Sequence, residues 1–503
     1  MRKPWLQKLA LGLFALYVFV LAAVAISVGA SEVTFGATVW GQERWVVGQS
    51  AAIRISPRDP SRRGTFIPGF SAEVVLIPEG QAPRSLVRLD SGDTAHSLRL
   101  DLPGDLPPGK ARLEVRLDRG DQGDVAAADI VLLAQPEAAA RPPRAKTRRK
   151  AKPGDEPAPP VTIELRPAGG VMVAELRQRM LLRATDPTGG PVRTAVALGV
   201  KGAKLDELPE RVETDVVGLA HFWVRPNYHE IKVLATPDGQ PTQTVEMHGK
   251  PAQFTAELGP LVVATQGRLS IAVESMHGRA PVHADLWQDG RWVDTTSGFL
   301  DNGRTRLELA PPAPGSVALV QVYRHFAAPG AARAALHVWP GPDPVAALPA
   351  LMAAAARRGL DGAWRAALAT GPPITDAGSA ERAAAWLLAG WPDKPPDPPV
   401  LVDTGPTLRA AAAGRRNRVR SRVVTALSAT GVLVVLTIAY VLIFHVLQLE
   451  RRYREHGPDE DHPFIRRSRA GWEAAILLAT IALAIVGLIV MLDGLRWGVE
   501  FGP

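Results

Sequence analysis

The chain has 503 residues, a formal net charge of +8 and no cysteine. The lack of cysteine excludes disulfides, thiolate nucleophiles and cysteine metal ligands. Much of the positive excess lies in clusters beside apolar runs and in one linker, so it does not indicate nucleic-acid binding, and we expect no nucleic-acid partner.

An apolar run opens the chain at residues 9–30, after the basic residues Arg2, Lys3 and Lys8. A helix needs about 20 residues to span a hydrocarbon core of about 30 Å, and this run is longer than that. Basic residues ahead of such a run favour a cytoplasmic N-terminus. We interpret residues 1–30 as a transmembrane anchor or a signal peptide. Small residues before Ser31 fit a cleavage site, whereas the run exceeds the usual signal core. Either interpretation exports the residues that follow.

Residues 31–135 show the period-2 alternation of half-buried strands. Leu113, Val115 and Leu117 alternate with charged residues directly after a Pro-Pro-Gly turn. The same order of strands and turns recurs in residues 161–257 and 258–340. Three such units predict serial β-sandwiches, with one larger irregular β domain as the alternative.

Residues 136–160 separate the first and second units and are rich in Pro, Ala and basic residues. This composition cannot bury a core and predicts a disordered, extended linker. We interpret it as a solvated tether. A basic strap for anionic lipid or polysaccharide is the alternative.

The second unit carries a sequence motif. Residues 186–192 read Asp-Pro-Thr-Gly-Gly-Pro-Val, and residues 214–222 read Thr-Asp-Val-Val-Gly-Leu-Ala-His-Phe. These stretches resemble the D-x-x-G-x-P-V and T-D-x-x-G-x-A-x-F patterns of macroglobulin-like domains and related bacterial Ig-like domains. The resemblance implies a row of sandwich modules. It does not imply the thioester, which needs a cysteine, or the large helical domain that carries the thioester.

The periodicity changes after Pro344. Residues 345–368 and 381–388 are rich in Ala and Leu and predict short helices, broken at residues 371–373 and 392–399 by Gly and Pro. We therefore expect a helical membrane-proximal region at residues 341–422. This region contains Trp364, Trp386 and Trp391. We interpret these side chains as core residues that pack between the helices, and a position at lipid headgroups is the alternative.

Two further apolar runs, residues 423–447 and 474–492, predict transmembrane helices. The loop between them, 448–473, is rich in arginine, which favours the cytoplasm and leaves the tail 493–503 exported. An arginine cluster at residues 415–422 opposes this layout, although the charge rule weakens for long exported domains. These features together predict a protein of the bacterial inner membrane with its bulk in the periplasm.

Candidate chemistry is sparse. Asp403-Thr404-Gly405 resembles the loop of aspartic proteases, but that mechanism needs two such aspartates, so we interpret the motif as incidental. Residues 456–462 hold two histidines and three acids and are interpreted as a solvated loop rather than a metal site. His445 lies within a predicted span near its cytoplasmic end. We therefore predict no catalytic, metal-binding or cofactor-binding residue and no cofactor.

These features predict a mainly β fold of serial Ig-like or macroglobulin-like β-sandwiches, with a small helical subdomain and transmembrane helices. The predicted function is a non-enzymatic, membrane-anchored scaffold or binding protein of the bacterial cell envelope. Its expected partners are the lipid bilayer and another envelope protein. The alternatives are a sensor or accessory subunit that relays binding to the loop at residues 450–469, and a hydrolase.

Overall fold

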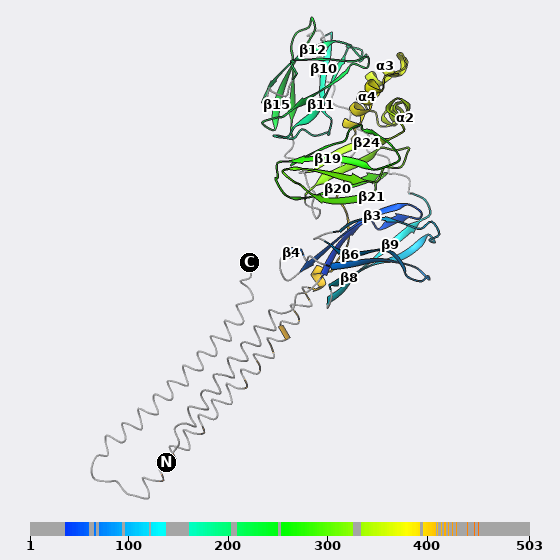
Figure 1. Ribbon diagram of the computed structural model, residues 1–503, viewed down its shortest axis with the longest axis vertical. Coiled ribbons are helices and arrows are strands. Elements are labelled where there is room, and N and C mark those ends of the chain that lie inside the picture. The colour runs from blue at the N-terminus through cyan, green and yellow to red at the C-terminus, as the bar shows by residue number, and fades with distance from the viewer. Residues whose placement is uncertain are drawn as a thin grey trace, which may run out of the picture. The chain divides into compact units, whose positions relative to one another are not determined.

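The computed structural model describes residues 36–59, 65–66, 70–92, 96–119, 122–136, 160–202, 209–249, 253–324, 333–392 and 396–408, with isolated positions beyond (Figure 1). The chain divides into two compact units, one of residues Met1–Thr34 with Pro406–Pro503 and one of residues Phe35–Gly405. Apart from those isolated positions, the three apolar runs, the loop 448–473, the tail 493–503, His445 and residues 456–462 lie outside the described residues, as do residues 137–159 of the predicted linker. Among the residues that the structure does describe, no helix is long and apolar enough to cross a membrane.

The first sandwich packs two five-stranded sheets together, one ordered β25-β1-β3-β4 with β7 on β3, the other β2-β9-β8-β5-β6. Leu113, Val115 and Leu117 are buried in its core, which confirms the period-2 alternation. The strands are β1 (Gly36–Gly41), β2 (Arg44–Val46), β3 (Ser50–Asp59), β4 (Thr65–Phe66), β5 (Phe70–Pro78), β6 (Arg84–Gly92), β7 (His96–Asp101), β8 (Gly109–Arg119), β9 (Gln122–Leu133) and β25 (Val400–Asp403).

Strand β25 comes from the region that the sequence predicted to be helical, residues 341–422. It pairs antiparallel with β1, with Thr38 opposite Asp403, and extends the sheet of the first sandwich. Its four residues are too short a run to carry a periodic signal of their own. The two ends of this unit therefore lie in neighbouring strands.

The second sandwich packs the sheet β10-β11-β14 against the sheet β13-β12-β15-β16. Alternate residues of β11 and β14, such as Met180, Leu182 and Phe222, fill its core. The strands are β10 (Thr162–Pro167), β11 (Gln178–Thr185), β12 (Ala195–Lys201), β13 (Arg211–Glu213), β14 (Leu219–Val224), β15 (Glu230–Pro237) and β16 (Gln243–His248).

The third sandwich packs the sheet β17-β19-β22 against the sheet β18-β24-β23-β20-β21. Strand β17 falls within the second unit as predicted from sequence, 161–257, but it pairs with β19 and buries Phe254 and Ala256 in the third core. The strands are β17 (Phe254–Glu257), β18 (Val262–Val263), β19 (Leu269–Ser275), β20 (Pro281–Gln288), β21 (Arg291–Phe299), β22 (Arg304–Leu309), β23 (Ala318–Tyr323) and β24 (Ala334–Pro340).

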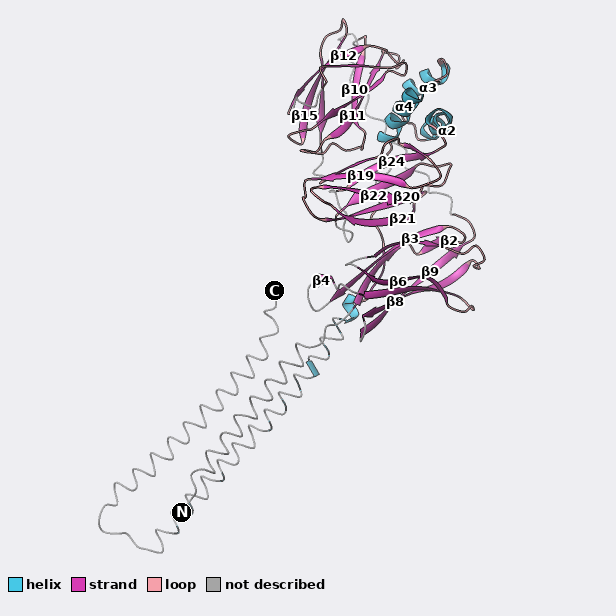
Figure 2. Cartoon of the chain, viewed as in Figure 1, coloured by secondary structure: helices cyan, strands magenta, loops and turns pink. Residues whose placement is uncertain are grey.

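Three helices follow the third sandwich, α2 (Pro344–Arg357), α3 (Gly362–Thr370) and α4 (Ala377–Ala389). The run at residues 345–368, from which short helices were predicted, is divided near Gly359, which adopts a positive φ of 71°. Helices α2 and α4 begin at aspartates whose side chains accept backbone N–H bonds, and α4 ends before Gly390. The strands thus dominate the described residues, and the helices α2, α3 and α4 lie together (Figure 2).

The helices share a hydrophobic core with the third sandwich, where Leu351 and Leu387 join Val338. Trp364, Trp386 and Trp391 are buried within the protein, as the core interpretation of these side chains predicted. The first sandwich packs on the third through β3, β7 and β21. The second sandwich contacts the helices and the third sandwich. The first sandwich therefore has the third, not its sequence neighbour the second, as its main neighbour in space.

Candidate functional site

The Asp-Thr-Gly motif forms the end of strand β25. Asp403 Oδ1 accepts hydrogen bonds from the Thr38 hydroxyl at 3.3 Å and from Gly405 N at 2.9 Å. The Thr404 hydroxyl accepts a bond from Ala37 N at 2.8 Å. Each of these contacts holds β25 against β1 or closes the turn that follows it. The motif therefore has a structural task in this fold.

The macroglobulin-like motif shapes two loops of the second sandwich. Asp186 Oδ1 accepts bonds from the N–H groups of Thr188 and Gly190, both at 2.8 Å. The hydrogen bond from the Thr188 hydroxyl, followed by that from Gly190 N, holds the pKa of Asp186 below its usual value. Asp215 Oδ1 accepts from Val217 N and Leu219 N at 3.0 Å each. These aspartates act as turn formers.

The same two loops dock the helices. Trp364 Nε1 donates to Val217 O at 3.0 Å, and Arg382 Nε donates to Asp215 Oδ2 at 2.6 Å. A Cβ atom added at Gly189 would lie 2.5 Å from Ala363 Cβ, so only glycine allows this close approach. The motif residues thus also form a surface that binds α3 and α4. This role was not predicted from the sequence.

An arginine and tryptophan cluster joins the helices to the outer face of β10 and β11. Asp361 accepts bonds from Arg166 at two 2.8 Å contacts and from Arg183 at a third. The Arg166 guanidinium lies 4.1 Å from the Trp386 ring centroid, and that of Arg183 lies 4.6 Å from the same ring. Burial raises the pKa of Asp361, but hydrogen bonding and charge from the two arginines outweigh it, and the net shift is downward.

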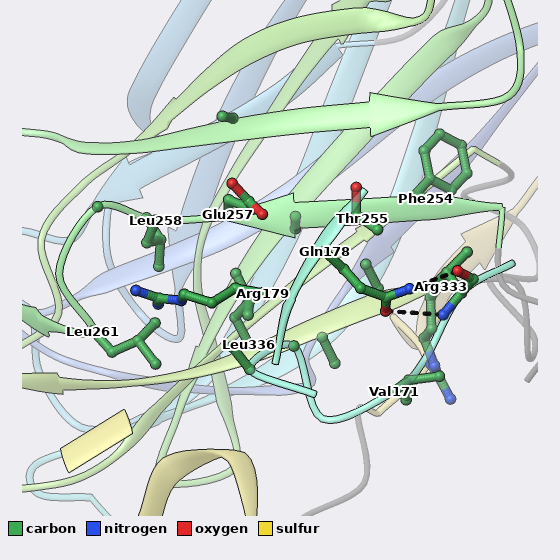
Figure 3. A pocket seen from close by; sticks show the side chains of 18 of the residues that line it. Val171, Gln178, Arg179, Phe254, Thr255, Glu257, Leu258, Leu261, Arg333 and Leu336 are labelled. Carbon is green, nitrogen blue, oxygen red and sulfur yellow. Dashed lines mark hydrogen bonds between the residues drawn. The ribbon is translucent and has the colours of Figure 1, made fainter. Parts of the chain in front are cut away.

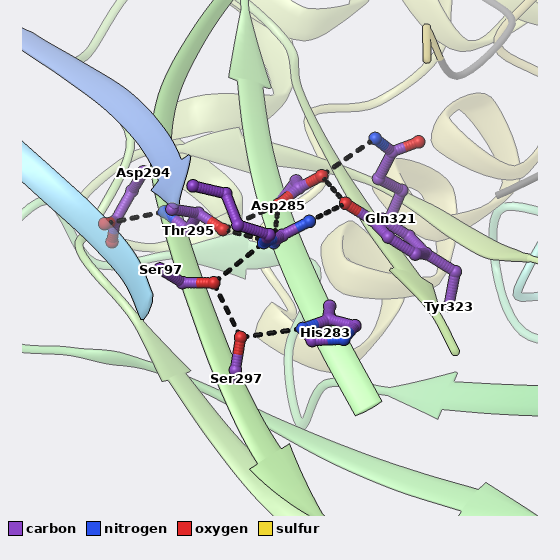
Figure 4. A network of polar contacts seen from close by, with 9 residues as sticks. Ser97, His283, Asp285, Asp294, Thr295, Ser297, Gln321 and Tyr323 are labelled. Carbon is purple, nitrogen blue, oxygen red and sulfur yellow. Dashed lines mark hydrogen bonds and ion pairs between the residues drawn. The ribbon is translucent and has the colours of Figure 1, made fainter. Parts of the chain in front are cut away.

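A second buried network joins the first and third sandwiches (Figure 4). Arg54 and Asp285 have fully buried side chains and form an ion pair at 2.8 Å. Arg54 also donates to Tyr323 at 2.6 Å, to Thr295 at 2.6 Å and to Ser97 at 2.9 Å. Burial is the main cause that raises the pKa of Tyr323 well above its usual value, so the phenol stays protonated and donates to Asp285.

Apolar side chains surround this network. Trp40 and Ala52 of the first sandwich form one buried cluster with four residues of the third, which are Trp287, Trp292, Leu319 and Tyr323. Water is excluded from the ion pair, and both charges are satisfied by several hydrogen bonds. The interface between these two sandwiches therefore resembles a protein interior more than a mobile hinge.

A cleft of about 490 Å³ lies between the second and third sandwiches (Figure 3). One wall is the outer face and edge of the sheet β17-β19-β22, and the other includes the start of β11 and Trp223. Its charged lining residues are Arg179, Glu257, Arg306 and Arg333. Burial raises the pKa of Glu257, and charges on Arg179 and Arg177 partly oppose that rise.

One wall of the cleft is fixed by helix α4. Glu381 Oε1 accepts a hydrogen bond from Leu261 N at 2.6 Å, and Leu261 lines the cleft. Burial raises the pKa of the Glu381 carboxyl. The helices, the second sandwich and the third sandwich therefore meet at this site, and residues far apart in the chain build it.

Three described histidines of the second and third sandwiches have separate surroundings. His277 Nε2 pairs with Gln253 at 3.0 Å, and His283 Nδ1 pairs with Ser297 at 2.7 Å. Burial, followed by the charges of Arg179 and Arg382, lowers the pKa of His221. In the part of the chain that the structure describes, no three His, Asp or Glu side chains gather into a metal-binding group.

Comparison with known proteins yields weak matches. No protein-family model and no curated protein matches the chain. Among solved structures, it is similar to Salmonella alpha-2-macroglobulin reacted with methylamine, at 12% identity and a TM-score of 0.17, over 61% of this chain and 23% of that one. It is also similar to native E. coli alpha-2-macroglobulin, at 11% identity and a TM-score of 0.17, over 62% of this chain and 23% of that one. The similarity to invasin, a bacterial integrin-binding protein, is 11% identity and a TM-score of 0.15, over 61% of this chain and 60% of that one.

The chain thus spans about a quarter of the length of these macroglobulins, 23% in both comparisons. TM-scores this low establish neither family nor function. The mainly β fold and its three sandwiches come from the strand pairing itself. The kinship with macroglobulin-like domains stays a prediction from the motif at residues 186–222.

Proposed function

We propose that this chain is a non-enzymatic binding scaffold of the bacterial cell envelope, exported and held at the membrane by its apolar runs. The observation that carries the proposal is the buried Arg54–Asp285 network, which fixes the first sandwich on the third. Separate modules on flexible linkers would expose such polar groups to water. A fixed arrangement instead presents the loops of the sandwiches at constant spacing, which suits recognition of a large partner.

The two ends of the sandwich unit support the membrane part of the proposal. Ala37 and Thr404 are joined by hydrogen bonds in both directions, with Thr404 N donating to Ala37 O at 3.0 Å. The chain therefore enters and leaves this unit through neighbouring strands. An anchor before residue 31 and spans after residue 422 would then both connect to the first sandwich.

The second candidate is a sensor or accessory subunit, and strand β25 favours it. This strand is the last described strand before the arginine-rich segment at residues 415–422 and the predicted span at residues 423–447, and it is hydrogen-bonded into a sheet of the first sandwich. A partner that shifts the first sandwich would move β25 with it. The relay would then reach the predicted cytoplasmic loop at residues 448–473.

Site-specific crosslinking in cells tests the binding proposal. A photoreactive residue is placed at Val125, Tyr228 or Met276, one exposed position in each sandwich, in the full-length chain. We expect a discrete covalent adduct with one envelope protein from at least one sandwich, recovered in the membrane fraction after irradiation. Unirradiated samples are the control. Absence of an adduct at all three positions would count against a partner-binding scaffold.

Deletion of a whole sandwich is a poorer test of the same proposal. Removing residues 161–257 would also remove β17 from the third sandwich and expose the Trp386 face of α4. The loss of binding would then follow from unfolding. Single substitutions at exposed positions avoid that difficulty.

A further inference from the structure

Two strands that line the cleft between the second and third sandwiches have an open edge. Among the described strands, β17 pairs only with β19. Strand β24 pairs with β18 only at Trp339 and Pro340, and no other described strand pairs on that side with the three β24 residues that line the cleft, Ala334, Ala335 and Leu336. Unpaired N–H and C=O groups of this kind accept an added strand from another chain.

Small side chains leave room for a peptide backbone at these edges. The cleft is lined by several alanines and glycines, which are Ala168, Gly169, Ala256, Gly259, Ala272, Ala334 and Ala335. Its volume of about 490 Å³ lies within the range of about 300–1,000 Å³ that is usual for ligand sites. A short extended segment fits such a site better than a bulky globular surface does.

The charged side chains in and beside the cleft indicate which kind of peptide segment it binds. Arg304 and Arg268, on the same outer face, form ion pairs with Glu274 at 3.2 Å and Glu308 at 3.5 Å. Arg179 and Arg306, in contrast, make no ion pair within the described part of the chain. Figure 3 shows Arg179 and Arg333 on opposite sides of the view, with Thr255 and Glu257 of β17 between them.

The balance of charge in the cleft is positive. Arg333 is paired with Asp397 at 2.8 Å. Among the described residues that line the cleft, Glu257 is the only acid. With Arg333 paired, the two remaining cleft arginines, Arg179 and Arg306, outnumber this single carboxyl. A carboxylate-bearing ligand would supply the partners that Arg179 and Arg306 lack.

We propose that this cleft binds an extended acidic segment of a partner protein as an added β-strand, with Arg179 and Arg306 holding its carboxylates. The proposal rests on the binding function proposed above and assigns the site of that function. Backbone bonds to β17 or β24 supply general affinity, and the two arginines supply selectivity for acidic side chains.

Fluorescence anisotropy on the full-length chain tests the cleft. The probe is a capped, labelled peptide of alternating valine and glutamate. Two matched probes carry lysine in place of glutamate, or N-methyl groups on alternate amides with the glutamates kept. We expect the first peptide to bind and the other two to lose most of the binding. The lysine probe loses charge complementarity, and the methylated probe loses the N–H groups of strand pairing.

Substitutions identify where the peptide binds. Arg179→Ala and Arg306→Ala should each weaken binding of the glutamate probe by about tenfold or more, because a hydrogen bond to a charged group is lost. Arg304→Ala is the matched control, since Arg304 lies two positions from Arg306 on the same strand and does not line the cleft. We expect it to change binding by less than about twofold.

Four results would overturn the proposal: no binding of the glutamate probe, equal binding of the lysine probe, undiminished binding of the methylated probe, or undiminished binding by the Arg179→Ala, Arg306→Ala double variant. The crosslinking experiment distinguishes failure of the cleft proposal from failure of the scaffold proposal. If the glutamate probe does not bind but the crosslinked adducts still form, also in the double variant, the scaffold proposal stands and only the cleft proposal is rejected.

Discussion

Arg54→Met is expected to destabilise the sandwich unit by about 3–5 kcal/mol, because it leaves the buried carboxylate of Asp285 without its cation. Methionine fills much of the same volume, so the loss reports charge and hydrogen bonding more than a cavity. The hydrogen bonds from Arg54 to Ser97, Thr295 and Tyr323 are lost as well. The measurement is chemical denaturation of the full-length chain followed by tryptophan fluorescence.

The shape of the transition carries further information. With the network intact, the first and third sandwiches should unfold together, whereas the variant should show a separate, earlier transition for the first sandwich. Arg84→Met is the matched control, because Arg84 pairs with Asp105 at 2.8 Å on the exposed surface. It should leave the transition nearly unchanged. Equal effects of the two substitutions would refute a structural role for the Arg54 network.

Asp361→Asn is expected to destabilise the helices on the second sandwich by on the order of 3 kcal/mol, because Arg166 and Arg183 lose their shared anion. Asparagine keeps the side-chain shape and tolerates the left-handed backbone at this position, where φ is 45°. The loss of stability therefore measures the contribution of the Asp361 charge. Limited proteolysis between α2 and α4 and thermal unfolding both measure it.

The stabilising contribution of Asp361 should be present at neutral pH and lost at low pH. The pKa of Asp361 is lowered in the folded protein, so its stabilising contribution is fully present above the ordinary carboxyl pKa of about 3.9. The contribution is lost as pH falls through the lowered value, and the difference between wild type and Asp361→Asn should shrink there.

Asp376→Asn is the control for the helix start. Asparagine also accepts the bond from Ser379 N, so this substitution should have little effect. If Asp361→Asn behaved like Asp376→Asn at neutral pH, the arginine and tryptophan cluster would not hold the helices in place.

Local patterns in the sequence were enough to predict the kind of fold. The alternation of Leu113, Val115 and Leu117 identified a half-buried strand, and Gly and Pro around residue 371 identified the end of a helix. These signals arise within a few residues of the chain. They therefore report secondary structure and its exposed face, but not which sheet a strand joins.

Long-range features had no such signal. Strand β25 joins a sheet built more than 300 positions earlier, as the 367-residue separation of Ala37 and Thr404 shows. Arg54 and Asp285 are 231 positions apart, and in the sequence each is an ordinary charged residue in an alternating strand. The cleft was missed for the same reason, because Arg179 and Arg306 come from different sandwiches. The motif at Asp186 and Asp215 was found, but its role in docking α3 and α4 was not.

The most direct test of the account is a distance measurement between sandwiches by pulsed electron paramagnetic resonance. The chain has no cysteine, so Val125→Cys and Tyr228→Cys create unique spin-label sites, exposed by 51% and 69%, in the first and second sandwiches. A rigid scaffold predicts one narrow distance distribution, which broadens when Arg54→Met is added. A broad distribution in the protein that retains Arg54 would contradict the central claim that buried networks fix the sandwiches into a single binding scaffold.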